Sequence, residues 1–128
     1  MFYLCIDFGF KKIGLATSSG EIASPWKILS TNSLKNSINQ INKIIAEEKF
    51  SKIIVGLPEG KMGKNTLKFV SHLQKQGINV ETADETLTSK NATELMIETG
   101  VPRNKRKHQD AVAASIILQR YLDQKNNL

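Results

Sequence analysis

Hydrophobic and polar positions divide the chain into short apolar runs at its start and longer amphipathic stretches after them. Residues 2–6 are apolar without a break, which is typical of a central strand that is covered on both faces. A turn at Gly9 precedes a second strand-like run at residues 13–17. A third run at residues 22–29 contains Pro25, which favours a position at the edge of a sheet. Three short strands in succession predict an antiparallel meander.

The period of the apolar positions then changes from two to about 3.6 residues, as expected for a helix with one buried face. The apolar positions on that face are Leu34, Ile38, Ile41, Ile44 and Ile45. Thr31, Asn32 or Ser33 can cap the start of this helix, because each side chain has an oxygen that accepts a backbone hydrogen bond.

The remaining sequence alternates between strand-like and helix-like segments. Strands are predicted at residues 52–58 and 78–83. Helices are predicted around residues 67–73, stopped by Gly77, between Ser89 and Gly100, and over residues 112–121. With right-handed crossovers, the order β-β-β-α-β-α-β-α-α predicts an α/β protein. Its mixed five-stranded sheet would combine the antiparallel meander with two further strands and carry helices on both faces. This is the layout of a ribonuclease H-like fold.

Length and composition predict one ordinary globular domain, residues 1–128, because two smaller cores would each bury too little surface. No apolar run approaches the ~20 residues that cross a bilayer, and the apolar start lacks the features of a signal peptide. The single cysteine, Cys5, has no disulfide partner and reads as a small buried hydrophobe. We therefore expect a cytoplasmic protein without a membrane role.

The net charge of +6 indicates a polyanionic partner, because phosphate backbones favour basic surfaces through counterion release. Basic residues cluster after the first strand, around the loop that follows "GLP", and in "RNKRK" at residues 103–107. The residues that we expect to contact nucleic acid are Lys11, Lys12, Lys61, Lys64, Arg103, Lys105, Arg106 and Lys107. The single tryptophan, Trp26, is expected to pack in the core or on the sheet and is assigned no function.

Four acidic residues occur where predicted strands end or where the last helix begins. Asp7 ends the first strand, Asp84 and Glu85 end the last strand, and Asp110 opens the final helix. Each alone has a plain structural role: a turn residue, a solvated strand end, or a complement to the helix dipole. In α/β sheets, however, ligand sites lie beyond the carboxyl ends of the strands, where such side chains converge. Carboxylate oxygens there suit Mg²⁺ or Mn²⁺, two of which, roughly 4 Å apart, can clamp a scissile phosphate.

Four segments, spread over nearly the whole chain, resemble a known family. The segments "CIDFGFKKIGLA", "IIVGLP" followed by four residues and then Gly63, "ADETLTSKNA", and "HQDAVAASIILQRYL" occur in the order seen in the YqgF family, also called RuvX or Holliday-junction-resolvase-like. The resemblance implies a ribonuclease H-like nuclease that processes the 5′ end of pre-16S rRNA in ribosome biogenesis. It also implies that Asp7, Glu85 and Asp110 are catalytic metal ligands, supported by Asp84.

Three positions depart from the family pattern. Phe10 stands where a small hydroxyl residue is usual, Met62 replaces a frequent aspartate, and Thr86 occupies the arginine position of the D-E-R motif. Threonine cannot hold phosphate bidentately as a guanidinium does, so either turnover is low or Arg103 or Arg106 supplies that group.

Several alternatives stay open on sequence alone. The protein could be a nucleic-acid-binding rRNA maturation factor with weak or no catalysis, or a resolvase-like endonuclease for branched DNA. A resolvase cuts two strands, so this question is tied to whether the chain is a monomer or a homodimer. An actin-like kinase or ATPase has a similar first-strand motif, but it needs two domains, and 128 residues supply one.

Overall fold

Five strands and three helices form the part of the protein that the structure describes. The computed structural model describes residues 2–9, 11–58, 61–84 and 109–126, except for the side chains of residues 61, 62, 84, 109, 110 and 126. The elements in chain order are β1 (Tyr3–Asp7), β2 (Lys12–Ser18), β3 (Ser24–Ser30), α1 (Leu34–Glu47), β4 (Lys52–Leu57), α2 (Lys61–Lys75), β5 (Val80–Asp84) and α4 (Gln109–Asn126).

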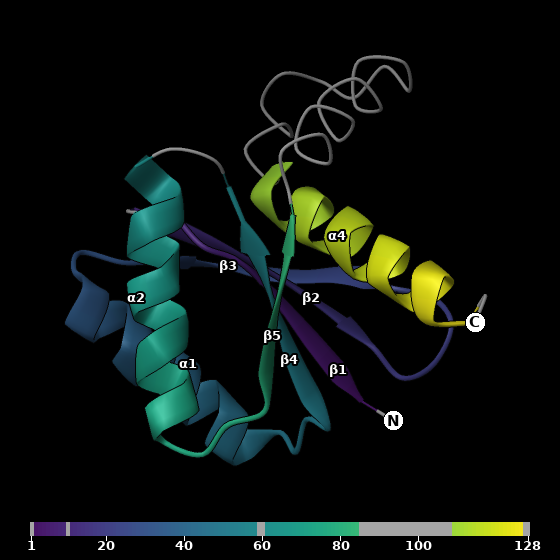
Figure 1. The fold of residues 1–128 in the computed structure, drawn as a ribbon, viewed down its shortest axis with the longest axis horizontal. Coiled ribbons are helices and arrows are strands. Elements are labelled where there is room, and N and C mark those ends of the chain that lie inside the picture. The colour runs from purple at the N-terminus through teal and green to yellow at the C-terminus, as the bar shows by residue number, and fades with distance from the viewer. Residues whose placement is uncertain (1, 10, 59–60, 85–108, 127–128) are drawn as a thin grey trace.

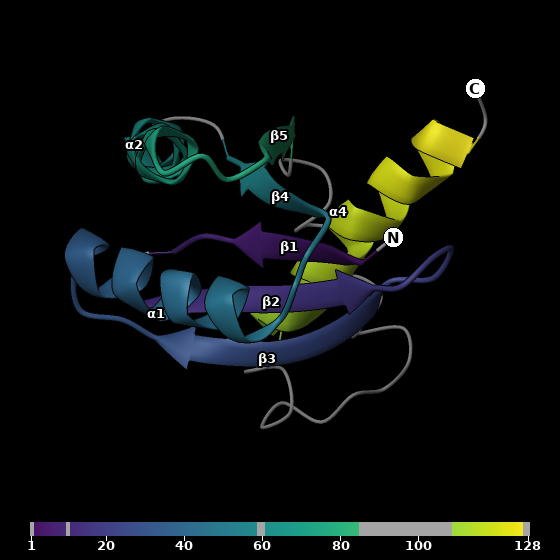
Figure 2. The same cartoon turned by 90° about the horizontal axis from the view of Figure 1, so that it is seen from below.

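The strands form one mixed sheet in the order β3-β2-β1-β4-β5. The pairs β1–β2 and β2–β3 are antiparallel, and the pairs β1–β4 and β4–β5 are parallel. Helices α1 and α2 cover one side of the sheet and α4 crosses the other side (Figures 1 and 2). The predicted meander, the edge position of the strand with Pro25 and the ribonuclease H-like layout with helices on both faces are confirmed.

Strand β1 is buried on both faces, and its side chains alternate between two cores. Leu4 and Ile6 belong to the core beneath α1 and α2, while Tyr3 and Cys5 belong to the core beneath α4. Because side chains alternate along a strand, Asp7 takes the α4 side, in line with Tyr3 and Cys5. The apolar run that predicted a central strand therefore also determines the face on which its terminal carboxylate lies.

The helices on the first side begin and end as their local sequences require. Ser33 is the N-cap of α1, and its hydroxyl accepts a hydrogen bond of 3.0 Å from the backbone N–H of Asn36. Gly77 follows α2 with φ of 84°, a left-handed conformation that glycine adopts without strain. The Ile78 N–H then donates to the Leu73 carbonyl at 3.3 Å, which closes the end of the helix. The predicted cap region and stop are both confirmed.

The two sides of the sheet differ in the size of their buried side chains. Leucine, isoleucine and phenylalanine dominate the side that α1 and α2 cover. On the other side, Ala114 of α4 is fully buried against a cluster that includes Cys5 and Ala16, and Ala111 and Ala113 are also buried. Small residues let a helix approach a sheet closely, so α4 packs tightly against this side.

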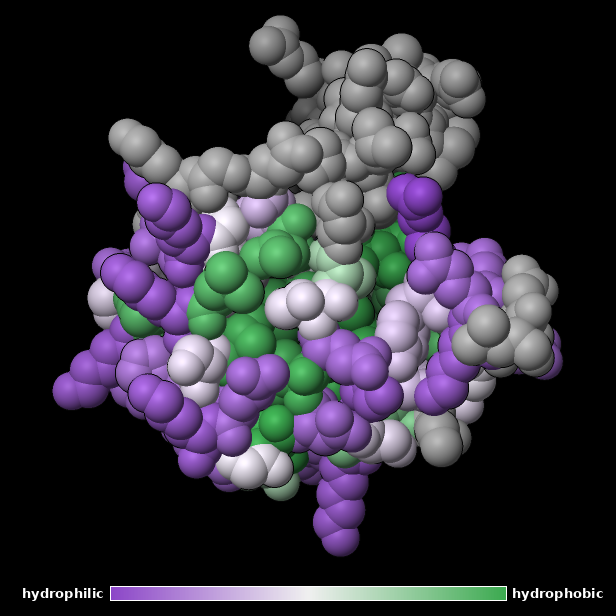
Figure 3. All heavy atoms as spheres, in the orientation of Figure 1, coloured by the Kyte–Doolittle hydropathy of each residue, from purple (hydrophilic) through white to green (hydrophobic). Residues whose placement is uncertain are grey.

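One face of the molecule shows how polar and apolar residues are distributed over the helices and the sheet (Figure 3). In the view of Figure 3, hydrophilic residues form the periphery and hydrophobic residues gather between α2 and α4. None of the helices that the structure describes combines the length and the apolar character needed to cross a membrane. The helix that was predicted between Ser89 and Gly100 lies outside the described residues.

Candidate functional site

Asp7 lies at the carboxyl end of β1 with a glycine beside it on each neighbouring strand. Its register partners are Gly14 of β2 and Gly56 of β4, and the same row continues to Ile28 of β3 and Ala83 of β5. Residues opposite one another in a sheet share a face, so neither neighbouring strand places a side chain next to the half-exposed Asp7 carboxylate. We call these five register partners, Ile28, Gly14, Asp7, Gly56 and Ala83, the Asp7 row.

The two flanking glycines were not among the predicted site residues. Gly14 occurs in "KIGLA" and Gly56 in "IIVGLP", both inside runs that otherwise read as strands. Glycine weakens a strand interior and often marks a place where a ligand or another backbone comes close. This signal was present in the sequence, but pairing each glycine with Asp7 requires the strand register.

The start of α4 lies at the same edge of the sheet as Asp7. Ala111 and Val112 of α4 line a groove together with Ile28 and Lys12, and Ile28 belongs to the Asp7 row. Asp110 directly precedes Ala111 in α4, so its backbone lies at this edge. Its side chain is among those that the structure does not describe.

Of the two predicted acidic residues at the end of the last strand, the structure describes only the first. Asp84 is the last residue of β5, and its backbone pairs with Leu57, one step beyond the Asp7 row. Glu85 lies outside the described residues. Among the side chains that the structure describes, no three of the types His, Cys, Asp and Glu come together. The backbones of three of the four predicted acids, Asp7, Asp84 and Asp110, thus meet at one edge of the sheet.

Two further glycines keep the loops at this edge tight. A Cβ on Gly9 would lie 2.6 Å from the carbonyl oxygen of Lys12, and a Cβ on Gly63 would lie 2.5 Å from that of Pro58. Both distances are too short for a side chain, so these positions require glycine. The first contact closes the β1–β2 turn and the second brings the start of α2 against the end of β4.

The predicted basic residues are exposed wherever the structure describes their side chains. Lys11 and Lys12 follow the β1–β2 turn, and Lys64 lies in the first turns of α2. Lys61 is the first residue of α2, without a described side chain, and residues 103–107 lie outside the described part. The lysines next to Asp7 in sequence are thus free of the core and available to an anionic ligand.

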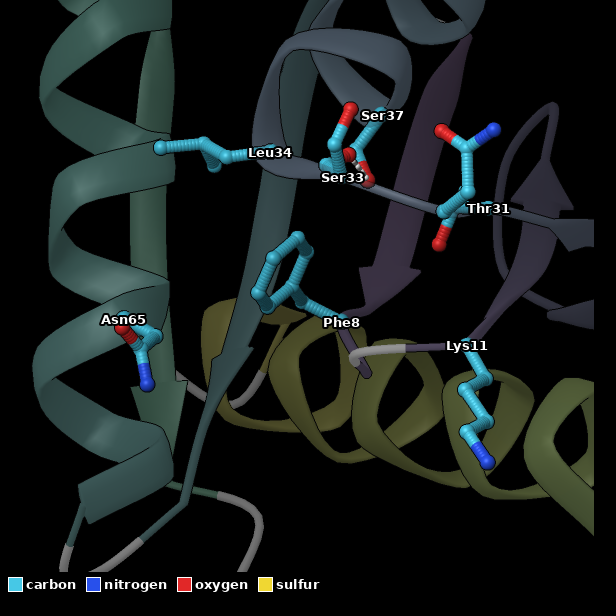
Figure 4. Close-up of a pocket in the computed structure, with 8 residues that line it drawn as sticks. Phe8, Lys11, Thr31, Ser33, Leu34, Ser37 and Asn65 are labelled. Atoms are coloured by element: carbon cyan, nitrogen blue, oxygen red, sulfur yellow. Dashed lines mark hydrogen bonds between the residues drawn. The ribbon is translucent and has the colours of Figure 1, made fainter.

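A cavity of about 600 Å³ lies behind Asp7, on the side of α1 and α2. Figure 4 shows the ring of Phe8 between Asn65 of α2 and Thr31 ahead of α1. The lining residues are Phe8, Lys11, Thr31, Asn32, Ser33, Leu34, Ser37 and Asn65. Phe8 also stacks on Phe69, with ring centroids 4.8 Å apart. Strand β1 separates this cavity from the Asp7 side chain, so the acidic edge and the cavity are distinct features.

At the opposite, amino edge of the α4 side, the charged groups are paired. Lys52 Nζ lies 3.3 Å from Glu81 Oε1 and 3.3 Å from the Tyr121 hydroxyl, and Lys125 Nζ donates to the Tyr3 hydroxyl at 3.0 Å. Hydrogen bonds from Tyr121 and then from Lys52 lower the pKa of Glu81, and Tyr121 and Glu81 raise the pKa of Lys52. We call these five residues the amino-edge cluster; their mutual pairing is typical of a structural contact.

The chain is similar in sequence to the members of one protein family. The model of the family described as "RuvX: Holliday junction resolvase" matches residues 1–124. A relative from Natranaerobius thermophilus named "Putative pre-16S rRNA nuclease" is 37% identical over 94% of this chain and 93% of its own length. A relative of the same name from Thermoanaerobacter pseudethanolicus is 38% identical over 95% and 96% of the two chains.

Two solved structures share the fold at low sequence identity. RuvC from T. thermophilus, in complex with a Holliday junction substrate, aligns with a TM-score of 0.64 at 13% identity over 99% of this chain and 96% of its own. The Fowlpox virus Holliday junction resolvase aligns with a TM-score of 0.66 at 13% identity over 98% and 99%. Both confirm the expected fold class.

Proposed function

The chain belongs to the RuvX family of Holliday junction resolvases, and from this premise we propose that it is a metal-dependent nuclease that processes the 5′ end of pre-16S rRNA. The observation that carries the proposal is the Asp7 row. A carboxylate at the end of a fully buried strand, with a glycine on each side, faces the helix that brings Asp110 to the same edge.

Asp7, Glu85 and Asp110 are the proposed catalytic residues and metal ligands, with Asp84 in support. Carboxylate oxygen is the ligand type that Mg²⁺ and Mn²⁺ prefer, and the glycines opposite Asp7 place no side chain beside its carboxylate, which supports a metal site here. When bound, the ion would neutralise charge on the scissile phosphate and lower the pKa of the attacking water.

The chain itself positions the Asp7 carboxylate and supplies positive charge for the phosphates of the substrate. Strand β1 is buried along its length and held by β2 and β4, so the Asp7 carboxylate is fixed before the substrate arrives. Lys11 and Lys12, directly after the turn at Gly9, bring positive charge to the phosphates that flank the reacting one. Lys61, Lys64, Arg103, Lys105, Arg106 and Lys107 extend this contact as part of the proposal.

A second candidate is an RNA-binding maturation factor with little catalysis. It is favoured by Thr86, which stands where the family pattern has arginine, and by Phe10 in place of a small hydroxyl residue. Under this alternative the basic surface would bind pre-rRNA, and the salt dependence of binding would be retained without cleavage.

The test is cleavage of a labelled RNA that carries the 5′ leader of pre-16S rRNA, with Mg²⁺, Mn²⁺ or EDTA. We expect the wild type to cut only with metal, and Asp7→Asn to lose at least about a hundredfold in rate while unfolding at the same urea concentration. Asp123→Asn, which changes an exposed aspartate near the far end of α4, is the matched control and should cut normally. A four-way DNA junction, tested in parallel, separates the RNA nuclease from a resolvase.

Full activity of Asp7→Asn would exclude the proposed site. If the wild type and Asp7→Asn both bind the RNA in a salt-dependent way and neither cleaves it with Mg²⁺ or Mn²⁺, the result would favour the maturation factor.

A further inference from the structure

The groove between the sheet and the start of α4 has a volume of about 500 Å³ and lies beside the Asp7 row. Ile28 of β3 lines it on one side, and Ala111 and Val112 of α4 line it on the other. Lys12 of β2 and Ser30 of β3 pair with each other in the sheet and line the groove at its carboxyl edge. We call this groove the Lys12 groove.

Strand alternation places the Lys12 side chain on the same face of the sheet as Asp7. Gly14 pairs with Asp7, and Lys12 precedes Gly14 by two positions on β2, so the two side chains share a face. Ala16, two positions after Gly14, is buried beneath α4, which confirms the face. Lys12 is therefore a diagonal neighbour of Asp7 across the β1–β2 pair. Such neighbours lie about 7–8 Å apart, within reach of a long side chain.

The lysine next to Lys12 in the sequence belongs to the other side of the sheet. Lys11 lines the cavity on the side of α1 and α2, together with Phe8 and Ser37. The sequence predicted that both lysines contact nucleic acid, but only Lys12 lines the groove beside the Asp7 row. The structure thus gives two adjacent residues of equal charge different surroundings.

The chemistry of the groove suits a nucleotide. No carboxylate is among the described residues that line it, and Lys12 forms no ion pair within the described part of the chain. An apolar floor with one positive charge at its edge can hold a sugar and base along the floor and a phosphate at the charge. The Trp26 ring contributes no stacking surface here, because it packs on Phe50 on the side of α1 and α2, as predicted for a residue on the sheet.

We propose that the Lys12 groove holds an RNA nucleotide close to the cleaved bond, with its phosphate on Lys12 and its ribose and base along Ile28, Ala111 and Val112. This inference rests on the proposed function, because it gives the path of the strand that the same nuclease cuts. The distance of about 7–8 Å between the diagonal neighbours corresponds to about two nucleotides at ~3.4 Å of rise each. Contact with a phosphate does not depend on the base, so the groove positions the strand and does not read its sequence.

A photo-crosslinker at Ser30 tests this path directly. Cys5 is the only cysteine of the chain and is buried, so Ser30→Cys can be labelled selectively with azidophenacyl bromide. The full chain with Asp7→Asn, in EDTA, removes cleavage from the experiment. The label should crosslink to the pre-16S leader RNA within about three nucleotides of the mature 5′ end, as mapped by primer extension. Ser24→Cys, exposed at the other end of β3, is the matched control and should not crosslink there.

Substitutions of the two lysines separate their roles. At equal bound fraction of RNA, Lys12→Ala should reduce the crosslink from position 30 by at least about fivefold, and Lys12→Arg should keep it because the charge remains. Lys11→Ala removes the same charge from the other side of the sheet and should keep the crosslink. Lys12→Ala should also lower the slope of log affinity against log salt by about one, whereas Lys43→Ala, on exposed α1 surface, should change neither quantity.

Equal crosslinking of the labels at positions 30 and 24, or none from either, would overturn the inference. A crosslink from position 30 that survives Lys12→Ala, or one that lies far from the mature 5′ end, would also overturn it. These outcomes are separate from the cleavage test. A protein that fails to cut pre-16S RNA can still crosslink from position 30, and a protein that cuts can carry its substrate along another path.

Discussion

The two ends of the α4 side of the sheet are built from opposite kinds of residue. At the amino edge, the amino-edge cluster consists of large side chains that satisfy one another, with Lys52, Glu81 and Tyr121 in contact and Lys125 bonded to Tyr3. At the carboxyl edge, the Asp7 row has glycine on both sides of its carboxylate. Large side chains pair with one another at the amino edge, whereas residues without a side chain flank the carboxylate at the carboxyl edge, and this difference is the one that we expect between a structural contact and a binding site.

The largest expected effect comes from adding a side chain beside Asp7. Gly56→Ala adds a methyl group beside Asp7 on β4, and we expect cleavage to fall by roughly ten- to a hundredfold because reacting groups tolerate little displacement. The comparison is Ile54→Val, two residues earlier on the same strand and face, which should lose about 0.5–1.5 kcal/mol of stability and little activity. Activity assays and urea unfolding of both variants measure the two effects.

If Gly56→Ala and Ile54→Val lose the same amount of activity, then any change in β4 lowers cleavage and Gly56 has no special role beside Asp7. Gly20→Ala is a control for the substitution itself, because a Cβ there meets no atom within 4 Å.

A smaller effect is expected where α4 approaches the sheet. Ala114 is fully buried against Cys5 and Ala16, so Ala114→Leu forces extra carbon atoms into a closely packed contact. We expect a loss of about 1–3 kcal/mol in the free energy of unfolding, measured by urea denaturation. Gln124→Leu, at an exposed position of the same helix, should change it by less than about 0.5 kcal/mol. An unchanged midpoint for Ala114→Leu would contradict the close approach of α4.

The smallest effect concerns the amino-edge cluster. Tyr121 and Lys52 lower the pKa of Glu81, so the ionised glutamate stabilises the fold above its ordinary pKa of 4.5, and this contribution is lost as the pH falls through the lower folded value. Because Glu81 is largely exposed, Glu81→Gln should cost only about 0.2–1 kcal/mol at neutral pH. At acid pH, below the lowered pKa of the folded state, the difference from wild type should vanish.

Urea midpoints at both pH values test this prediction, with Glu47→Gln, an exposed glutamate of α1 outside the cluster, as the control. A difference that persists at low pH would mean that packing and not charge holds the cluster together. Cleavage should be unaffected at neutral pH, since the cluster lies at the far edge from Asp7.

Local patterns predicted most of the individual elements. The unbroken apolar run of β1, the 3.6-residue period of α1 and the stop at Gly77 all appear where they were expected. Helix α2 starts at Lys61, well before the apolar positions at residues 67–73 that predicted it. Its first turns are held by the contact of Gly63 with Pro58, which leaves no periodic apolar signal in the sequence.

The sequence by itself determined that Asp7 ends a central strand and that Asp110 lies at the start of a helix with small residues, because both follow from short-range periodicity and residue size. That Gly14 and Gly56 flank Asp7, and that β3 has a bulge at Trp26, follows from the tertiary structure alone. Strand register joins segments that are far apart in the chain, and its free energy comes from packing over the whole sheet, so no local pattern contains it.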